Sequence, residues 1–160
     1  MRKSHLIKPV LGSDYPVISH GKGIYLYDKN GKQYIDGSSG AITCNIGHGV
    51  HEVAEAMWNQ ANHVSFVYRS QFTSEAAEQL AEKIAHYAPG DLNSVFFVNS
   101  GSEATETALK VAIQYFQEQG NMTKTKVISR WTSYHGITLG ALSMSGHKLR
   151  RQRFTSLLED

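Results

Sequence analysis

The strongest constraint on the fold is the junction between an apolar run and an amphipathic segment at residues 94–112. The run "SVFFV" (94–98) is continuous and rich in β-favouring residues, which is typical of a parallel strand covered on both faces. A second short run of this kind, "TKVIS", follows at 125–129. Strand, helix and strand within about thirty-five residues predict a βαβ unit, and hence an α/β fold with a parallel sheet. Between the two runs, one helical stripe is formed by Ala104, Ala108, Val111, Ala112 and Tyr115.

Other elements can be placed from local patterns. In "GIYLYDKNGKQYID" (23–36), two β-favouring runs flank an Asn-Gly dipeptide, which is well suited to a tight turn, so we predict a β-hairpin. The glycine-rich stretch 37–49 has little periodicity and predicts a shaped loop. Apolar residues recur with helical spacing at 50–61 and 74–88, which predicts two amphipathic helices.

Length and charge exclude several classes of protein. With 160 residues, the chain is long enough for one ordinary domain, and a second complete domain is not expected. The formal net charge is only +2, so nucleic acid and anionic membrane surfaces are not expected partners. No window approaches a transmembrane span, and the first residues do not form a signal-peptide pattern. We therefore predict a cytoplasmic protein with no nucleic-acid or membrane partner.

Three polar features of the sequence are assigned no function. Cys44 is the only cysteine, which rules out an internal disulfide; we interpret it as a small packing residue, because no base for a nucleophilic thiol can be identified. His48 and His51 form an H-x-x-H pair, but no further ligands complete a site, so no metal is predicted. The basic residues between Lys148 and Arg153 are interpreted as a solvated face.

The residues that follow the first apolar run allow two interpretations. Ser100-Gly-Ser-Glu103 matches a capping box, in which Ser100 accepts from the Glu103 N–H and the Glu103 carboxylate accepts from the Ser100 N–H. On that interpretation they only begin a helix. In the second interpretation, the unpaired amides of the first turn bind an anion, Gly101 allows close approach, and the Ser102 hydroxyl adds a donor. A phosphate suits such a site, at the carboxyl end of a strand.

A second motif, "SYHG" (133–136), follows the second predicted strand. Because neighbouring parallel strands bring their carboxyl ends together, we expect Tyr134 and His135 to lie beside the proposed phosphate site. An aromatic face next to an anion site suits a flat phosphorylated ring. The G-x-G-x-x-G fingerprint and the P-loop motif are absent, so neither a dinucleotide nor a P-loop nucleotide is supported.

These motifs resemble those of a known family. "FFVNSGSEATETALKVA", followed by "SRWTSYHGITLGALSMSG", is similar to the class III, or ω-amino, aminotransferases, which use pyridoxal 5′-phosphate. The segments "YDKNGKQYIDGSSGAITCNIGHG" and "VSFVYRSQFTSEAAEQLAEKIA" match as well. The resemblance implies an α/β protein of pyridoxal-phosphate fold type I, with the amino-terminal hairpin and an incomplete large-domain sheet. Residues 1–49 would form an arm, the hairpin and a pocket loop of the small domain, and residues 50–160 the start of the large, cofactor-binding domain.

The resemblance also implies roles for residues. The loop 39–45 would border the substrate pocket, with Ala41 and Ile42 at the pocket; Ile42 stands where some relatives carry a large aromatic residue. By the same resemblance, the site would form at a homodimer interface. The cofactor-binding residues would be Ser100, Gly101 and Ser102 at the phosphate, Tyr134 on the pyridine ring, and His135 and Gly136 beside that ring.

The resemblance covers only the amino-terminal portion of such an enzyme. Transamination needs a lysine that holds the cofactor aldehyde as a Schiff base and an acidic residue that keeps the pyridine nitrogen protonated. In the family both lie beyond the position of Asp160, so we expect no catalytic residue within these residues, and none of Lys110, Lys124 and Lys126 is placed to reach the ring. The chain alone is expected to be inactive and, with an unpaired apolar strand edge, poorly stable.

Three functions are open at this point. The first is a pyridoxal-phosphate-dependent transaminase, which moves an amino group from an amino donor, an ω-amino compound in such a family, to a 2-oxo acid such as pyruvate or 2-oxoglutarate. The second keeps the fold and the cofactor but carries out aminomutase or decarboxylase chemistry. The third is a non-catalytic phosphate-binding or assembly module.

Overall fold

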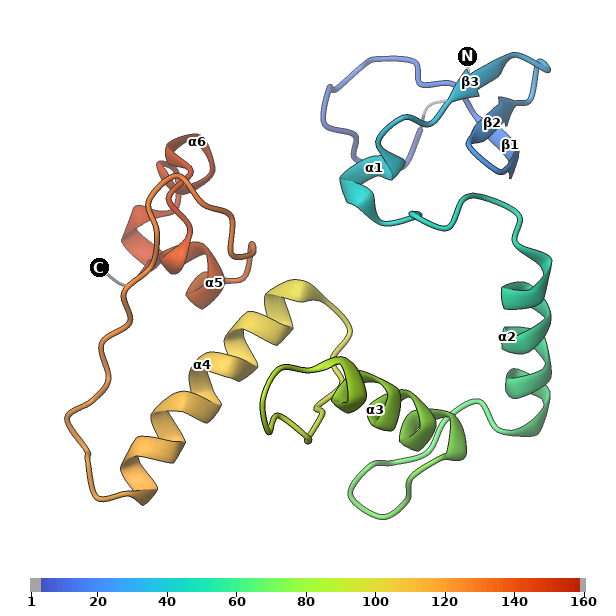
Figure 1. The fold of residues 1–160 in the computed structure, drawn as a ribbon. Helices are drawn as coiled ribbons and strands as arrows, with labels where there is room; N and C mark the ends of the chain where they lie inside the picture. The colour runs from blue at the N-terminus through green and yellow to red at the C-terminus, as the bar shows by residue number, and fades with distance from the viewer. Residues whose placement is uncertain (1–3, 159–160) are drawn as a thin grey trace. The chain divides into compact units, whose positions relative to one another are not determined.

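The computed structural model of the chain describes residues 4–158. The chain forms two compact units, Met1–Ser74 and Glu75–Asp160, and each is described by itself. The first contains a small antiparallel sheet and helices, and the second is helical (Figure 1). The protein is thus a mixture of helices and strands whose sheet is antiparallel. The predicted division between residues 49 and 50 concerns the domains of a whole enzyme and stays a prediction.

The sheet of the first unit has the strand order β1-β2-β3 with antiparallel pairing throughout. The predicted hairpin is confirmed: in its register Tyr25 pairs with Ile35 and Leu26 pairs with Tyr34. A shift in register near Ile18 marks an irregularity in the pairing of the first two strands. The strands are β1 (Ile18–Lys22), β2 (Tyr25–Asp28) and β3 (Gln33–Ile35).

The turn between β2 and β3 is built around the Asp28 carboxylate, which is 7% exposed. Its Oδ1 accepts from the N–H groups of Asn30 at 2.8 Å and Lys32 at 3.0 Å, and its Oδ2 accepts from the Tyr34 hydroxyl at 2.9 Å. Burial raises the pKa of Asp28, but the bonds from Lys32, Tyr34 and Asn30 lower it more, so this pKa lies below its ordinary value. Gly31 has φ 82°, in the left-handed region that the Asn-Gly turn requires.

The glycine-rich stretch 37–49 folds back onto the sheet. An isolated antiparallel bridge joins Gly23 to His48: the Gly23 N–H donates to the His48 oxygen at 2.9 Å, and the His48 N–H donates to the Gly23 oxygen at 2.8 Å. Within this stretch, α1 (Ser39–Ile42) is a single irregular turn with non-helical backbone inside it. The prediction of a shaped loop is therefore confirmed, and the bridge holds the end of this loop against the sheet.

Helices occupy the segments in which apolar residues recur with helical spacing. α2 (His51–His63) and α3 (Glu75–Tyr87) confirm the helices predicted at 50–61 and 74–88. The first turn of α3 carries two glutamates, whose charge suits the positive end of a helix.

The second unit is built on one long helix, α4 (Gly101–Glu118), which confirms the helix predicted after the first apolar run. In the described part of the chain, the apolar side chains that are almost fully buried are Ala141 and Leu142. Both belong to α5, which contacts α4 and α6. Three short elements follow α4, namely α5 (Leu139–Met144), α6 (Lys148–Arg151) and the 3-10 turn η1 (Thr155–Leu157).

The predicted parallel sheet is not present within residues 4–158. Residues 94–98 and 125–129 form no strand, and the described sheet consists of β1, β2 and β3. A strand forms only when its N–H and C=O groups meet those of a partner, and a parallel partner comes from chain remote in sequence. Apolar character marks a segment as suited to a covered strand, but it does not specify the neighbour. The expectation that these two runs pair with each other is therefore wrong.

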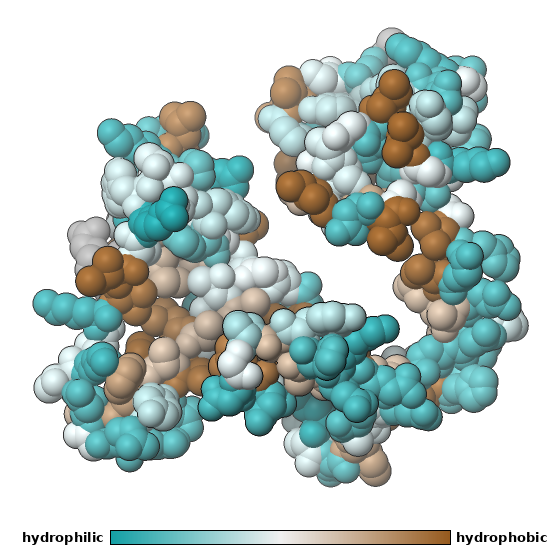
Figure 2. Space-filling model, viewed as in Figure 1, coloured by the Kyte–Doolittle hydropathy of each residue, from teal (hydrophilic) through white to brown (hydrophobic). Residues whose placement is uncertain are grey.

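Large apolar side chains are exposed in both units (Figure 2). Ile128 is 100% exposed and Phe96 is 57% exposed, so the two apolar runs are largely open to solvent. The unpaired apolar strand edge expected from the sequence is not formed by these two runs, because neither is a strand, and the low stability expected of the chain alone stays a prediction. Among the described residues, no helix has the length and apolar character that a membrane crossing needs.

Candidate functional site

The first turn of α4 is capped by its own side chains. Ser100 has extended backbone (φ −151°, ψ 160°), and its Oγ accepts from the Glu103 N–H at 3.2 Å. The Glu103 carboxylate accepts from the Asn99 N–H at 2.7 Å, and not from the predicted Ser100 N–H. The capping interpretation is correct with this change, and neither capping bond uses the amides of Gly101 and Ser102.

The loop that carries the second motif is held against this turn. The Thr105 hydroxyl donates to the His135 carbonyl oxygen at 2.9 Å, and the Ile137 N–H donates to Ser102 Oγ at 3.0 Å. These bonds join residues 30 and 35 positions apart. The structure therefore brings the two predicted motifs together in one unit, through contacts between a helix and a loop and not through neighbouring strands.

Gly136 lies where the loop passes directly against α4. Its φ is 137°, in the region that favours glycine. A Cβ at this position would lie 2.7 Å from Ser102 Oγ and 2.6 Å from the Ala141 Cβ, which is closer than real contacts allow. Both the backbone conformation and the lack of space therefore require glycine here.

A further contact joins α5 to α4 beside the loop. Glu106 Oε1 accepts from the N–H groups of Gly140 at 2.9 Å and Ala141 at 3.2 Å, in the first turn of α5. The Thr138 side-chain hydrogen bond is the main cause that holds the pKa of Glu106 below its ordinary value; burial opposes it, and the two N–H groups and Lys110 assist it. Glu106 is therefore an ionised carboxylate at neutral pH, placed at the positive end of a helix.

Tyr134 lies on the open side of the loop and is 54% exposed. The Arg150 guanidinium lies over its ring, 4.9 Å from the ring centre. Arg151 lies over the Trp131 ring, and its Nη1 donates to carbonyl oxygens at the end of α5. The basic cluster, interpreted from sequence as a solvated face, therefore also holds the loop and α5 in place, because a guanidinium can stack and donate at the same time.

The groups at the start of α4 are suited to an anion. Ser102 Oγ uses a lone pair for the Ile137 N–H, so its own proton remains for another acceptor. The amides of Gly101 and Ser102 lie at the positive end of an 18-residue helix. His135 Nε2 is buried and has no hydrogen-bond partner in the part of the chain that the structure describes. A buried polar atom of this kind is normally satisfied, so the donor set fits a phosphorylated ring that adds both an anion and a polar edge.

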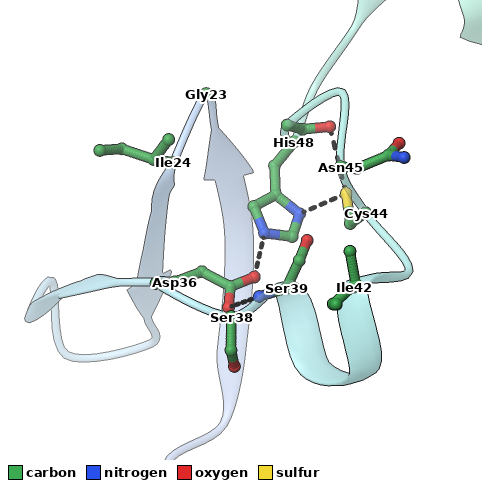
Figure 3. Close-up of a pocket in the computed structure, with 11 residues that line it drawn as sticks. Gly23, Ile24, Asp36, Ser38, Ser39, Ile42, Cys44, Asn45 and His48 are labelled. Carbon is green, nitrogen blue, oxygen red and sulfur yellow. Dashed lines mark hydrogen bonds and ion pairs between the residues drawn. The ribbon is translucent and has the colours of Figure 1, made fainter.

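The two residues predicted at a substrate pocket lie in the first unit. Ile42 lines a cavity of ≈ 440 Å³ between the loop and the sheet (Figure 3). Its φ is 61°, which is unusual for a β-branched residue. Ala41 belongs to the same irregular turn, but it does not line this cavity. The assignment of Ala41 and Ile42 to a substrate pocket stays a prediction.

Three side chains at this cavity form a hydrogen-bonded chain (Figure 3). His48 Nε2 lies 2.8 Å from Asp36 Oδ2, and His48 Nδ1 lies 3.4 Å from Cys44 Sγ. The hydrogen bond with His48 is the main cause that holds the pKa of Asp36 below its ordinary value; burial opposes it, and the Ser39 N–H, which donates to Asp36 Oδ1 at 2.8 Å, assists it. The interpretation that no base lies near Cys44 is wrong, because the returning loop brings His48 to the thiol.

Sequence reasoning missed the residues that connect these clusters. Thr105 and Glu106 lie one turn into α4, directly after the turn that binds the loop, and this position is the sequence signal for them. Asp36 and His48 are 12 positions apart, and no periodic pattern links them. Only the bridge between the loop and the sheet shows that they meet. No group of His, Cys, Asp and Glu side chains suited to a metal ion occurs among the described residues.

Solved structures with similar backbones are aminotransferases. The adenosylmethionine-8-amino-7-oxononanoate aminotransferase from Methanocaldococcus jannaschii matches with a TM-score of 0.91 and 33% identity, over 98% of this chain and 37% of that one. The omega transaminase from Pseudomonas jessenii, solved in complex with PMP, matches with a TM-score of 0.84 and 34% identity, over 88% of this chain and 31% of that one. The extended segments 94–98 and 125–129 are thus part of a backbone that larger enzymes share.

The sequence itself is similar to proteins of the same kind. The chain is 64% identical over 156 residues to the uncharacterized aminotransferase YodT of Bacillus subtilis, which covers 98% of this chain and 35% of that protein. It spans about a third of the length of these relatives. Residues 12–159 match the family described as aminotransferase class-III. The chain belongs to the class-III aminotransferase family.

Proposed function

We propose that the whole protein is a pyridoxal-phosphate-dependent transaminase, in which these residues hold the phosphate and the ring of the cofactor. The observation that carries the proposal is the pair of bonds from Thr105 to His135 and from Ile137 to Ser102, which supports one site with an anion-binding turn and an aromatic residue. Family membership supports the amino-transfer chemistry. The complex of a related omega transaminase with PMP supports the choice of cofactor.

Each residue has a defined task in this proposal. The amides of Gly101 and Ser102 and the Ser102 hydroxyl bind the phosphate, and Ser100 fixes the turn through its cap bond. Tyr134 covers one face of the ring and excludes water from it. His135 bonds to a polar group through Nε2, and Gly136 lets the loop close on α4. When bound, pyridoxal phosphate supplies the electron sink that weakens bonds at the carbon bearing the amine.

Other parts of the proposal concern the rest of the protein. A Schiff-base lysine and an acidic partner for the pyridine nitrogen are supplied from outside these 160 residues. Ala41 and Ile42 border the substrate pocket, where Ile42 leaves more room than a large aromatic residue. Two copies of the protein form the site together, so that sedimentation of the whole protein gives the mass of a dimer.

The phosphate site is tested by cofactor binding. In the whole protein, Ser102→Ala should raise the dissociation constant for pyridoxal phosphate roughly tenfold, because a hydrogen bond to a charged group is lost. Ser94→Ala is the matched control, an exposed serine of the same unit, and should leave the constant unchanged. Equal affinities for wild type and Ser102→Ala, measured by fluorescence titration, would contradict the assignment.

The ring contact is tested with a pair of variants at one position. Tyr134→Phe keeps an aromatic face and should retain most of the cofactor affinity, whereas Tyr134→Ala should lose about 1 kcal/mol of binding free energy. The two variants remove the same hydroxyl, so their difference isolates the ring. A Phe variant as weak as the Ala variant would assign the role of Tyr134 to its hydroxyl and not to stacking.

The reaction is tested with an ω-amino compound as donor and with pyruvate or 2-oxoglutarate as acceptor. Transamination by the whole protein should yield alanine or glutamate in amounts equal to the donor consumed, as measured by chromatography. If the donor were converted to a positional isomer and no amino group reached the acceptor, the protein would be an aminomutase. Release of carbon dioxide would indicate a decarboxylase. Absence of a borohydride-reducible attachment of pyridoxal phosphate to the whole protein would favour the non-catalytic module.

A further inference from the structure

The cavity of the first unit contains a thiol, an imidazole and a carboxylate in hydrogen-bonded order. Cys44 Sγ lies 3.4 Å from His48 Nδ1, and His48 Nε2 lies 2.8 Å from Asp36 Oδ2 (Figure 3). A nucleophile beside a base, with a third group that orients the base, is the arrangement by which proteins activate weak nucleophiles. None of these three side chains has a task in the proposed cofactor site.

The carboxylate determines which nitrogen of His48 can act as the base. An ionised carboxylate can only accept hydrogen bonds, so His48 Nε2 carries the proton directed at Asp36, and when the ring carries that one proton, Nδ1 presents its lone pair to Cys44. The ring cannot easily turn away. The Ser39 N–H holds the carboxylate at 2.8 Å, and a Cβ at Gly21 would come within 2.6 Å of the His48 Cβ, so strand backbone lies directly against the histidine.

The Cys44 thiol is partly exposed to solvent. Its Sγ also lies 3.1 Å from the Gly47 carbonyl oxygen, which can accept from the S–H. Asp36, Cys44 and His48 are the titratable residues that line the cavity, and the neighbouring sheet edge contributes the backbone of Gly23. The thiol proton therefore has two acceptors, and one of them is a base.

We propose that Cys44 is a covalent modification site, at which the thiol reacts with small uncharged electrophiles while His48 takes up its proton. For an alkylating agent, the sulfur lone pair attacks carbon, the S–C bond forms, and the bond from carbon to the leaving group breaks. The leaving group departs as an anion with the bonding electrons. The thiol proton moves to His48 Nδ1, the imidazolium keeps its Nε2–H on Asp36, and solvent then takes up the additional proton.

The size and charge of the cavity select the electrophile. Its volume of ≈ 440 Å³ admits a small molecule, and the other lining residues are glycine, serine, asparagine and isoleucine. Of the residues that line the cavity, Asp36 is the one whose side chain carries a fixed charge. Its carboxylate repels an anionic reagent, and no lysine or arginine in the lining compensates for it. A neutral reagent such as iodoacetamide is therefore favoured over its anionic analogue iodoacetate.

The experiment measures the rate at which iodoacetamide labels Cys44 in the whole protein, with peptide mass spectrometry to resolve this thiol from any other. At about pH 7 the rate for His48→Asn should be roughly tenfold lower than for wild type, because general-base assistance is lost. At about pH 10, where an ordinary thiol ionises by itself, the two rates should converge. Asp36→Asn should lower the rate at neutral pH toward that of His48→Asn.

Two comparisons keep the result decisive. His20→Asn removes another histidine of the same unit, which stacks on Tyr27, and Cys44 in this variant should label at the wild-type rate.

The bridge from Gly23 uses only the backbone of His48, so His48→Asn retains it. If that variant nevertheless unfolds, the labelling rate of native wild type is compared with that of wild type in concentrated guanidinium chloride. The proposal would be overturned if the native thiol were labelled no faster at about pH 7 than the denatured thiol. It would also be overturned if the native thiol preferred iodoacetamide over iodoacetate no more than the denatured thiol does.

Discussion

The hairpin with its loop, residues 18–48, and the region of α4 and α5, residues 100–146, both gather polar side chains, but over different distances along the chain. In the first region, the bond from Tyr34 to Asp28 spans 6 positions and the contact of His48 with Asp36 spans 12. In the second, the bond from Ile137 to Ser102 spans 35 positions. The hairpin closes by the geometry of a turn, whereas the second region closes only after the chain has run along α4 and returned through the segment that follows it.

This difference determines what a single substitution can break. A turn depends on the backbone conformation available to one residue, so a substitution there lowers the stability only by the backbone strain at that residue. A contact between remote segments depends on the volume at the point where they meet, so a single added carbon displaces a whole loop. Substitutions in the α4 region should therefore have the larger effects.

The largest effect is expected for Gly136→Ala. This change adds a Cβ at 2.7 Å from Ser102 Oγ and 2.6 Å from the Ala141 Cβ, and it places an L-residue at φ 137°. Overpacking and backbone strain together should lower the free energy of unfolding by about 3 kcal/mol. Urea unfolding of the whole protein without cofactor measures this loss.

Gly101→Ala is the matched control for that measurement. Position 101 also lies in the first turn of α4, but nothing lies within 4 Å of a Cβ built there. The free energy of unfolding should stay within about 0.5 kcal/mol of wild type, since alanine is favoured in a helix. Equal losses for the two variants would show that the loop does not approach α4 as described, and would remove the distinction between the two regions.

A smaller effect is expected for Glu106→Gln, and it should depend on pH. The pKa of Glu106 is depressed in the folded protein, chiefly by the Thr138 hydrogen bond, so its carboxylate contributes stability that is present above the ordinary pKa and is lost as pH falls through the folded value. At about pH 7 the variant should be less stable by roughly 2 kcal/mol, and at about pH 3 the difference should shrink. Glu118→Gln, at the far end of α4, is the control; a pH-independent deficit of Glu106→Gln would assign the loss to packing.

The same difference between regions explains what could be predicted from the sequence. The Asn-Gly turn, the cap at Ser100 and three helices were predictable, because each is specified by neighbouring residues. The pairing of 94–98 with 125–129 was wrong, because an apolar run carries no information about its partner. The two motifs of the proposed cofactor site did come together, although through Thr105 and Ile137 and not through strand ends. Contacts such as these depend on tertiary packing, which periodicity does not encode.

The smallest effect is expected at the hairpin, for Gly31→Ala. Gly31 has φ 82°, which alanine adopts only with strain, but nothing lies within 4 Å of a Cβ built there. The variant therefore measures backbone strain without overpacking, and the loss should be about 1 kcal/mol. Hydrogen exchange of the β2 and β3 amides in the whole protein should become faster by a factor that corresponds to this loss of stability, while exchange in α5 should not change. A loss as large as that of Gly136→Ala would mean that the hairpin is tied to distant parts of the protein, and that its closure is no more local than that of the second region.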